Sequence, residues 1–313
     1  MNKSLVKSVF LALFLTSLTA LNAHAGKFDD FKDSPEGKYP AGLVDHGAQL
    51  PNSFDAKTET IDAFGTRTPA KAVALYKDKG VWAIGLNHTK KLLKKMKISY
   101  TTLNARDIQA GKLDSKKFSM IVMPGGKSWI YLDDLKETGA KAIRDFVAGG
   151  GGYLGTCAGA FFATARRKDS NRNDIPYGIG LLEGTAYDGT SLGTAPFRSG
   201  SIDITYHLKN FKPNFKVLLL GGPALLYTAE EAAAKNIQEL ATFPGFNKPA
   251  MITFNYGQSR VSLSGPHGEV DENRLVKTPK AWKDPDSEWP ILKQVISWLR
   301  KEGAHPTLAP ALN

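Results

Sequence analysis

Apolar residues along this chain alternate between short compact runs and longer segments with a single apolar face. Runs of four to seven such residues are typical of buried strands, whereas spacings of three and four residues are typical of helices. The compact runs predict strands at 72–76, 98–103, 119–123, 153–156, 201–207, 216–220, 250–256 and 260–264. The one-sided segments predict a helix that ends near Lys97 and further helices at 135–147, 229–241 and 291–299. The glycine run 149–152 would end the second helix.

Strands that alternate with helices predict an α/β protein with a mostly parallel central sheet covered on both faces. We therefore expect a flavodoxin-like three-layer sandwich, with one α/β domain over residues 66–303 and a short tail over 304–313. Residues 26–65 are polar and rich in Gly, Pro, Asp and Lys, and they predict an extended arm.

The first 25 residues have the pattern of a secretory leader. A basic segment with Lys3 and Lys7 precedes an apolar run of 14 residues, and Ala23-His24-Ala25 then supplies a small-x-small cleavage site. Spanning a bilayer takes about 20 apolar residues, so we expect cleavage after Ala25 and no stable membrane insertion. The mature protein would be periplasmic or secreted.

Composition narrows the class of protein. With 42% apolar and 23% charged residues the chain is globular, and its single cysteine excludes an internal disulfide and a Cys-rich zinc site. The net charge is +11, but its basic clusters are typical of a solvated helix face at 90–97 and a polar loop at 166–172. No nucleic-acid module accompanies them, so no nucleic-acid partner is predicted.

Two patterns that would indicate a cofactor or metal fail on context. Residues 150–155 match G-x-G-x-x-G, but the dinucleotide motif follows a strand and opens a helix, whereas this one follows a helix and opens a strand. The histidines that follow the leader lack the close spacing that metals favour. We predict neither cofactor nor metal.

The strongest signal is Gly155-Thr156-Cys157-Ala158-Gly159, the cysteine form of G-x-S-x-G. In such a nucleophile elbow the reactive side chain sits at a sharp strand-to-helix turn, and glycines let neighbouring backbone pass close. A helix N-terminus beside the sulfur favours the thiolate, the nucleophilic form. Cys157 is therefore a candidate nucleophile, with a small buried residue at a tight turn as the alternative.

Two other segments supply the remaining parts of an active site. His267 follows a predicted strand and precedes Glu269 by two residues, so it could take the thiol proton while Glu269 orients the imidazole. At the end of another strand, Gly125 and Gly126 offer backbone N–H groups that could form an oxyanion hole with the N–H of Ala158.

These motifs resemble the class I glutamine amidotransferase-like superfamily. Within it, residues 123–126, 151–160 and 264–267 look like the N-terminal domain of fungal biotin-protein ligases and its stand-alone bacterial relatives. The resemblance covers roughly residues 70–300 and implies a flavodoxin-like sheet with a Cys157–His267–Glu269 triad. Gly268 replaces the proline of the usual His-Pro-Glu turn, and we recognise no synthetase domain to receive ammonia.

The sequence thus predicts an exported cysteine amidohydrolase that cleaves a carboxamide or amide-like bond of a small molecule or peptide through a thioester. Trp129, Tyr131 and Tyr187 are candidate pocket residues, with packing as the alternative for each. Two other functions stay open, a non-catalytic binding or scaffold protein that keeps the fold and a redox-responsive thiol protein. The patterns give no indication of an oligomeric state.

Overall fold

The computed structural model describes residues 44–45, 49–61, 67–168, 174–188, 200–271, 275–276 and 286–310. The predicted leader and much of the predicted arm lie outside these residues. Within them, no helix combines the length and the apolar character that crossing a membrane requires.

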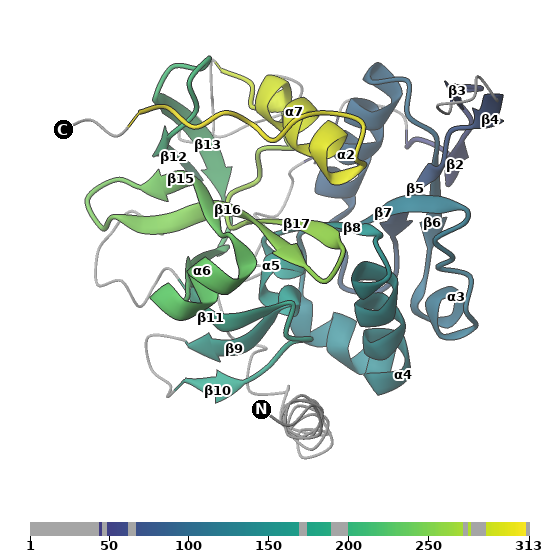
Figure 1. The fold of residues 1–313 in the computed structure, drawn as a ribbon, viewed down its shortest axis with the longest axis horizontal. Helices are drawn as coiled ribbons and strands as arrows, with labels where there is room; N and C mark the ends of the chain where they lie inside the picture. The colour runs from purple at the N-terminus through teal and green to yellow at the C-terminus, as the bar shows by residue number, and fades with distance from the viewer. Residues whose placement is uncertain are drawn as a thin grey trace, which may run out of the picture.

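The centre of the fold is a ten-stranded sheet in the order β13-β12-β15-β16-β17-β8-β7-β5-β6-β2 (Figure 1). Its strands are β2 (Ser53–Phe54), β5 (Ala72–Tyr76), β6 (Tyr100–Leu103), β7 (Phe118–Met123), β8 (Gly152–Thr156), β12 (Gly200–Tyr206), β13 (Asn214–Leu219), β15 (Gln238–Phe243), β16 (Lys248–Tyr256) and β17 (Ser259–Ser264). From β17 to β6 neighbouring strands run parallel, and all other pairs are antiparallel.

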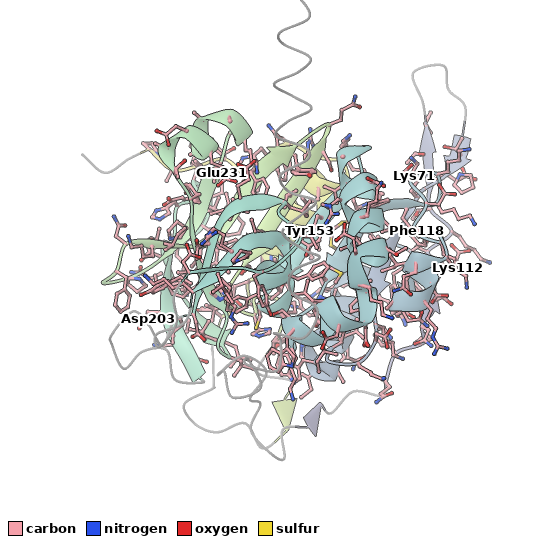
Figure 2. The ribbon with its side chains drawn as sticks, turned by 90° about the horizontal axis from the view of Figure 1, so that it is seen from below. Lys71, Lys112, Phe118, Tyr153, Asp203 and Glu231 are labelled. Carbon is pink, nitrogen blue, oxygen red and sulfur yellow. The ribbon has the colours of Figure 1, made fainter. Side chains whose placement is uncertain are left out.

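The expectation of a mostly parallel sheet is therefore confirmed for the core and wrong at its flanks. Parallel neighbours need a long crossover, which the helices supply between β5 and β8. Beyond residue 200, β12 with β13, β15 with β16 and β16 with β17 are joined by short connections, which allow only antiparallel pairing. Figure 2 shows the span of the molecule, with Asp203 of β12 and Lys112 toward opposite ends and Tyr153 of β8 in the interior.

Both faces of the parallel core are buried, and side chains alternate between them. Val73 and Leu75 pack on the face that α2 and α7 cover, whereas Ala74 and Tyr76 pack on the face that α3, α4 and α5 cover (Figure 1). The helices are α2 (Ala83–Lys95), α3 (Ala105–Gln109), α4 (Ser128–Ala148), α5 (Ala158–Ala163), α6 (Ala229–Lys235) and α7 (Trp289–Leu299). The three layers agree with the predicted architecture.

A second, four-stranded sheet lies on the α4–α5 side, in the order β10-β9-β11-β14. Its strands are β9 (Thr164–Lys168), β10 (Ile175–Pro176), β11 (Leu182–Asp188) and β14 (Pro223–Leu226). The predicted polar loop at 166–172 is wrong over its described residues, because Arg166–Lys168 belong to β9. Arg167 is fully buried, with its guanidinium 4.3 Å from the Phe161 ring centroid and 3.8 Å from Asp188 Oδ2. In the sequence, a basic run that contains a buried arginine looks the same as a solvated basic segment.

The described part of the predicted arm is attached to the domain by short strand pairings and by a contact with α2. Three short pairings involve this region, with β1 (Val44–Asp45) against β18 (Leu275–Val276), β2 against β6, and β3 (Glu59–Ile61) against β4 (Arg67–Pro69). The Lys90 ammonium donates to the Leu50 carbonyl at 3.0 Å, so part of the predicted solvated face of α2 binds the arm. At the other end, Leu308 of the tail bridges Leu208.

The predicted helix at 229–241 is half as long as expected. α6 ends at Lys235, and Asn236 adopts a left-handed conformation with φ 52° and ψ 54°. Gln238–Phe243 then form β15, which pairs with β12 and β16. These residues have good helix propensity, but pairing on both edges of the strand overrides that preference.

This helix end yields a test. A left-handed residue with a Cβ costs about 1–2 kcal/mol relative to glycine, while asparagine tolerates the conformation better than alanine. We expect Asn236→Ala to lower the free energy of unfolding by about 1 kcal/mol and Asn236→Gly to leave it unchanged or raise it. Urea unfolding of the two variants checks this. If helix continued through residue 241, the order would be reversed, because alanine is the better helix former.

Candidate functional site

Cys157 lies at the junction of β8 and α5, with Thr156 as the last strand residue and Ala158 as the first helical residue. Its backbone has φ 50° and ψ −105°, a region that L-residues rarely occupy. The glycines around it permit close backbone packing. A Cβ at Gly155 would lie 2.6 Å from the Gly159 carbonyl oxygen, and a Cβ at Gly159 would lie 2.0 Å from that of Met123. The G-x-C-x-G spacing thus reflects backbone contact on both sides of the turn.

His267 and Glu269 lie on the turn that follows β17, the parallel neighbour of β8. The Cys157 N–H donates to the Ser264 carbonyl at 2.8 Å, which ties the two strand ends together. His267 Nδ1 and Glu269 Oε1 are 2.8 Å apart, and both side chains are buried. Parallel strands end at the same sheet edge, so this topology gathers residues that are 110 positions apart in the chain.

The charge of His267 is set by opposing effects. Burial lowers its pKa, but the carboxylate of Glu269 and the charge of a Cys157 thiolate raise it, and the net effect raises the pKa of His267 to about 10. Within the described residues, His267 Nε2 has no hydrogen-bond partner. The Cys157 sulfur lies 3.8 Å from the Leu220 carbonyl oxygen.

The loop after β7 brings Gly125 and Gly126 to the same place. A Cβ at Gly125 would lie 2.3 Å from His267 Cε1, so this loop packs directly on the imidazole. The Gly159 N–H donates to the Pro124 carbonyl at 3.2 Å, which joins the loop to the Cys157 turn.

Among the backbone hydrogen bonds that the described residues make outside helices and strands, none has the N–H of Ala158 or of Gly126 as its donor. Ala158 opens α5, and the first residue of a helix has no acceptor for its N–H within the helix. Gly126 forms an antiparallel β-bridge with Val81. The two hydrogen bonds of this bridge run from the Lys127 N–H to the Gly80 carbonyl and from the Trp82 N–H to the Gly125 carbonyl, each 2.9 Å long, so neither uses the Gly126 N–H. Both groups can therefore bind a ligand oxygen.

The three candidate pocket residues have different surroundings. Tyr131 is fully buried behind the glycine loop, with its hydroxyl 3.2 Å from the Pro124 carbonyl and 3.0 Å from the Gly125 carbonyl. Trp129 is buried in the core on the α4 face, and Tyr187 is half-buried on β11. These contacts are those of packing residues, and a role in substrate binding stays a prediction.

Three residues at the site were not predicted. Trp82 packs edge-to-face on His267, with ring centroids 4.9 Å apart and an interplanar angle of 76°. The Trp289 indole N–H donates to the Glu269 carbonyl at 2.9 Å, and the Leu220 carbonyl faces the thiol. Trp82 and Trp289 are lone tryptophans outside any motif, and the Leu220 contact is made by backbone, so no sequence pattern marks these residues.

The site as a whole is closed and free of metal-ligand clusters in the described region. Cys157 and His267 are fully buried and Glu269 is 5% exposed. No three His, Cys, Asp or Glu side chains of the described residues gather where they could hold a metal ion. The arrangement can perform acid–base and nucleophilic chemistry at a carbonyl group.

Comparison with known proteins gives a family match over most of the chain. The family model described as "Biotin-protein ligase, N terminal" matches residues 71–298. An uncharacterized protein from Chlamydia muridarum (strain MoPn / Nigg) is 28% identical over 210 residues, which cover 63% of this chain and 80% of that protein. The biotin–protein ligase of Schizosaccharomyces pombe (strain 972 / ATCC 24843) is 27% identical over 160 residues, 48% of this chain but 25% of the ligase.

Solved structures are similar only at a distance. A glutamine amidotransferase from Thermotoga maritima has a TM-score of 0.43 at 14% identity, and the match covers 66% of this chain and 79% of the amidotransferase chain. A putative ThuA-like protein from Bacteroides uniformis has the same TM-score and identity, with coverage of 74% and 91%.

The pKa of His267 yields a prediction on stability. A pKa raised above the unfolded value of about 6.5 stabilises the folded state fully below that pH, and the stabilisation is lost as pH rises through about 10. Glu269→Gln removes the carboxylate that raises the pKa. We therefore expect the free-energy difference between the wild type and Glu269→Gln to shrink as the pH of chemical unfolding is raised from 6.5 to 10. A difference that grows over this range would contradict the assignment.

Proposed function

This chain belongs to the biotin-protein ligase N-terminal family, and from its site we propose an exported cysteine-dependent hydrolase that cleaves a carboxamide or similar amide bond. The proposal rests on one observation above the others. The buried His267–Glu269 pair, 2.8 Å apart, lies on the strand end that is hydrogen-bonded to the strained Cys157 turn. A buried histidine–carboxylate pair beside a cysteine is the arrangement that activates a thiol.

The first half of the reaction forms a thioester. His267 Nε2 takes the proton of the thiol, and the sulfur forms a bond to the carbonyl carbon of the substrate. The oxyanion accepts hydrogen bonds from the N–H groups of Ala158 and Gly126. The carbon–nitrogen bond then breaks, and His267 returns its proton to the departing amine.

The second half restores the enzyme. Water gives a proton to His267 and attacks the thioester. The carbon–sulfur bond then breaks, and His267 passes the proton to the departing sulfur, which leaves a carboxylic acid and the thiol. Throughout, Glu269 accepts from Nδ1, holds the imidazole in one tautomer and stabilises its charged form. Gly268 allows this turn without the usual proline, and a Cβ there would lie 3.1 Å from the Glu288 Cβ.

The burial of the site favours a second candidate, a non-catalytic binding protein. Substrate would have to reach a fully buried sulfur and displace the segment that carries Leu220, whose carbonyl oxygen lies 3.8 Å from that sulfur. The same burial argues against a redox-responsive thiol, because oxidation follows thiolate character and exposure.

Export is the third part of the proposal and rests on the leader pattern of residues 1–25. Intact mass of the protein recovered from the periplasm or medium of an expressing cell tests it, with a chain that begins at Gly26 as the expected result. Recovery of the uncleaved chain from the cytoplasm alone would contradict export without bearing on the chemistry.

Activity is tested by ammonia release from a panel of primary carboxamides that includes glutamine, asparagine and amidated peptides. We expect Cys157→Ala to abolish release, because the thioester cannot form without the sulfur. His267→Ala should lower kcat by about 10²–10⁴-fold, the usual contribution of a general acid–base group. Lys116→Ala is the matched control and should keep the wild-type rate, because Lys116 is exposed and precedes β7, at the opposite end of that strand from the glycine loop.

Two outcomes would overturn the hydrolase. One is a Cys157→Ala protein that is folded and retains the full rate. The other is a wild type that releases no ammonia and whose thiol shows an unperturbed pKa, in which case the binding-protein candidate is preferred.

A further inference from the structure

We propose that Trp82 is a positioning residue for His267, so that the reactivity of the Cys157 thiol depends on this indole ring. The inference rests on the proposed function and adds a residue to the same site. Trp82 lies at the end of the loop between β5 and α2, outside the three motifs that form the candidate triad and oxyanion hole.

Two other sides of the imidazole, Nδ1 and Cε1, already have neighbours in the structure. Nδ1 faces Glu269 Oε1 at 2.8 Å, and the Cε1 edge faces Gly125, where a Cβ would lie only 2.3 Å from Cε1. The Trp82 ring packs at 76° against the imidazole with centroids 4.9 Å apart, which is an edge-to-face contact. Together these contacts define a single orientation of the ring.

Residue 82 also lies against the other two parts of the site. The backbone N–H of Trp82 donates to the Gly125 carbonyl at 2.9 Å, so the start of α2, which carries the indole, is attached to the glycine loop. A Cβ placed at Gly85 would lie 2.9 Å from both Trp82 Cε3 and Glu269 Oε1, so the indole and the carboxylate pack against the same glycine. Trp82 thus links the base, its carboxylate partner and the candidate oxyanion loop.

Trp82 belongs to a small apolar cluster separate from the two main cores. It packs with Leu218, Leu220 and Val270, and each of these is adjacent to the site. The Leu218 carbonyl accepts from the backbone N–H of His267 at 2.8 Å, and the Leu220 carbonyl faces the thiol. Loss of the indole would admit water and freedom of rotation at the imidazole, and both weaken its electrostatic coupling to the sulfur.

The test measures the thiolate directly, because the buried thiol reacts slowly with reagents. Cys157 is the only cysteine, so the absorbance difference at 240 nm between each protein and its Cys157→Ser counterpart follows a single thiol against pH. An activated thiol has a midpoint at about 3.5–7.5, against about 8.5 for an ordinary one. We expect Trp82→Leu, which keeps an apolar side chain, to raise the midpoint by about one unit, a tenfold fall in the thiolate-to-thiol ratio.

Two matched variants separate positioning from simple packing. Trp82→Phe keeps an aromatic ring and should retain a midpoint close to the wild-type value. Trp298→Phe changes another buried tryptophan, which packs on His305, and should leave the midpoint unmoved. The inference is overturned if Trp82→Leu lowers the melting temperature but keeps the wild-type midpoint, or if Trp82→Phe shifts the midpoint as far as Trp82→Leu.

His267→Ala distinguishes this inference from the function it rests on. A wild-type midpoint near 8.5 that His267→Ala does not change would overturn both the hydrolase and the role of Trp82. A low midpoint that His267→Ala raises and Trp82→Leu does not would overturn the role of Trp82 alone.

Discussion

The close approach of backbone around Cys157 is the constraint on which the rest of the site depends. The turn between β8 and α5 passes so near its neighbours that a Cβ at Gly159 would collide with the carbonyl of Met123. Hydrogen bonds then bind the turn to the end of β17 through Ser264 and to the glycine loop through Pro124. Because the turn is held on both sides, the strained conformation of Cys157 persists and the histidine turn and the glycine loop meet beside it.

The buried pair of His267 and Glu269 is the second element that this packing makes possible. Charged groups are costly to bury unless they are paired, and this pair is surrounded by Gly125, Gly85 and the indole of Trp82. Exclusion of water strengthens the attraction between the two groups, which is why the pKa of the imidazole rises although burial alone would lower it. The same exclusion closes the site, so the chemistry and the access of a substrate place opposite demands on one region.

The segment that carries Leu218 and Leu220 is where those demands meet. It leaves the large sheet at β13 and enters the second sheet at β14, crossing the site on the way. The Leu218 carbonyl accepts from the backbone N–H of His267, and the Leu220 carbonyl faces the Cys157 thiol. The connection between the two sheets is therefore part of the cover of the site. The strands of the second sheet carry buried polar residues such as Arg167, and such residues make a strand difficult to recognise from the sequence.

Patterns along the chain were sufficient to predict the α/β class, the strands of the parallel core and the three segments that meet at the candidate site. These are local properties, because compact apolar runs, amphipathic spacing and close-packed glycines such as Gly155 and Gly159 can be recognised within a few residues. No such pattern predicts the antiparallel flanks, the strand at Gln238–Phe243 or the packing of Trp82 on His267. Each of these depends on partners distant in the chain, and a residue whose role comes from such a partner carries no pattern of its own.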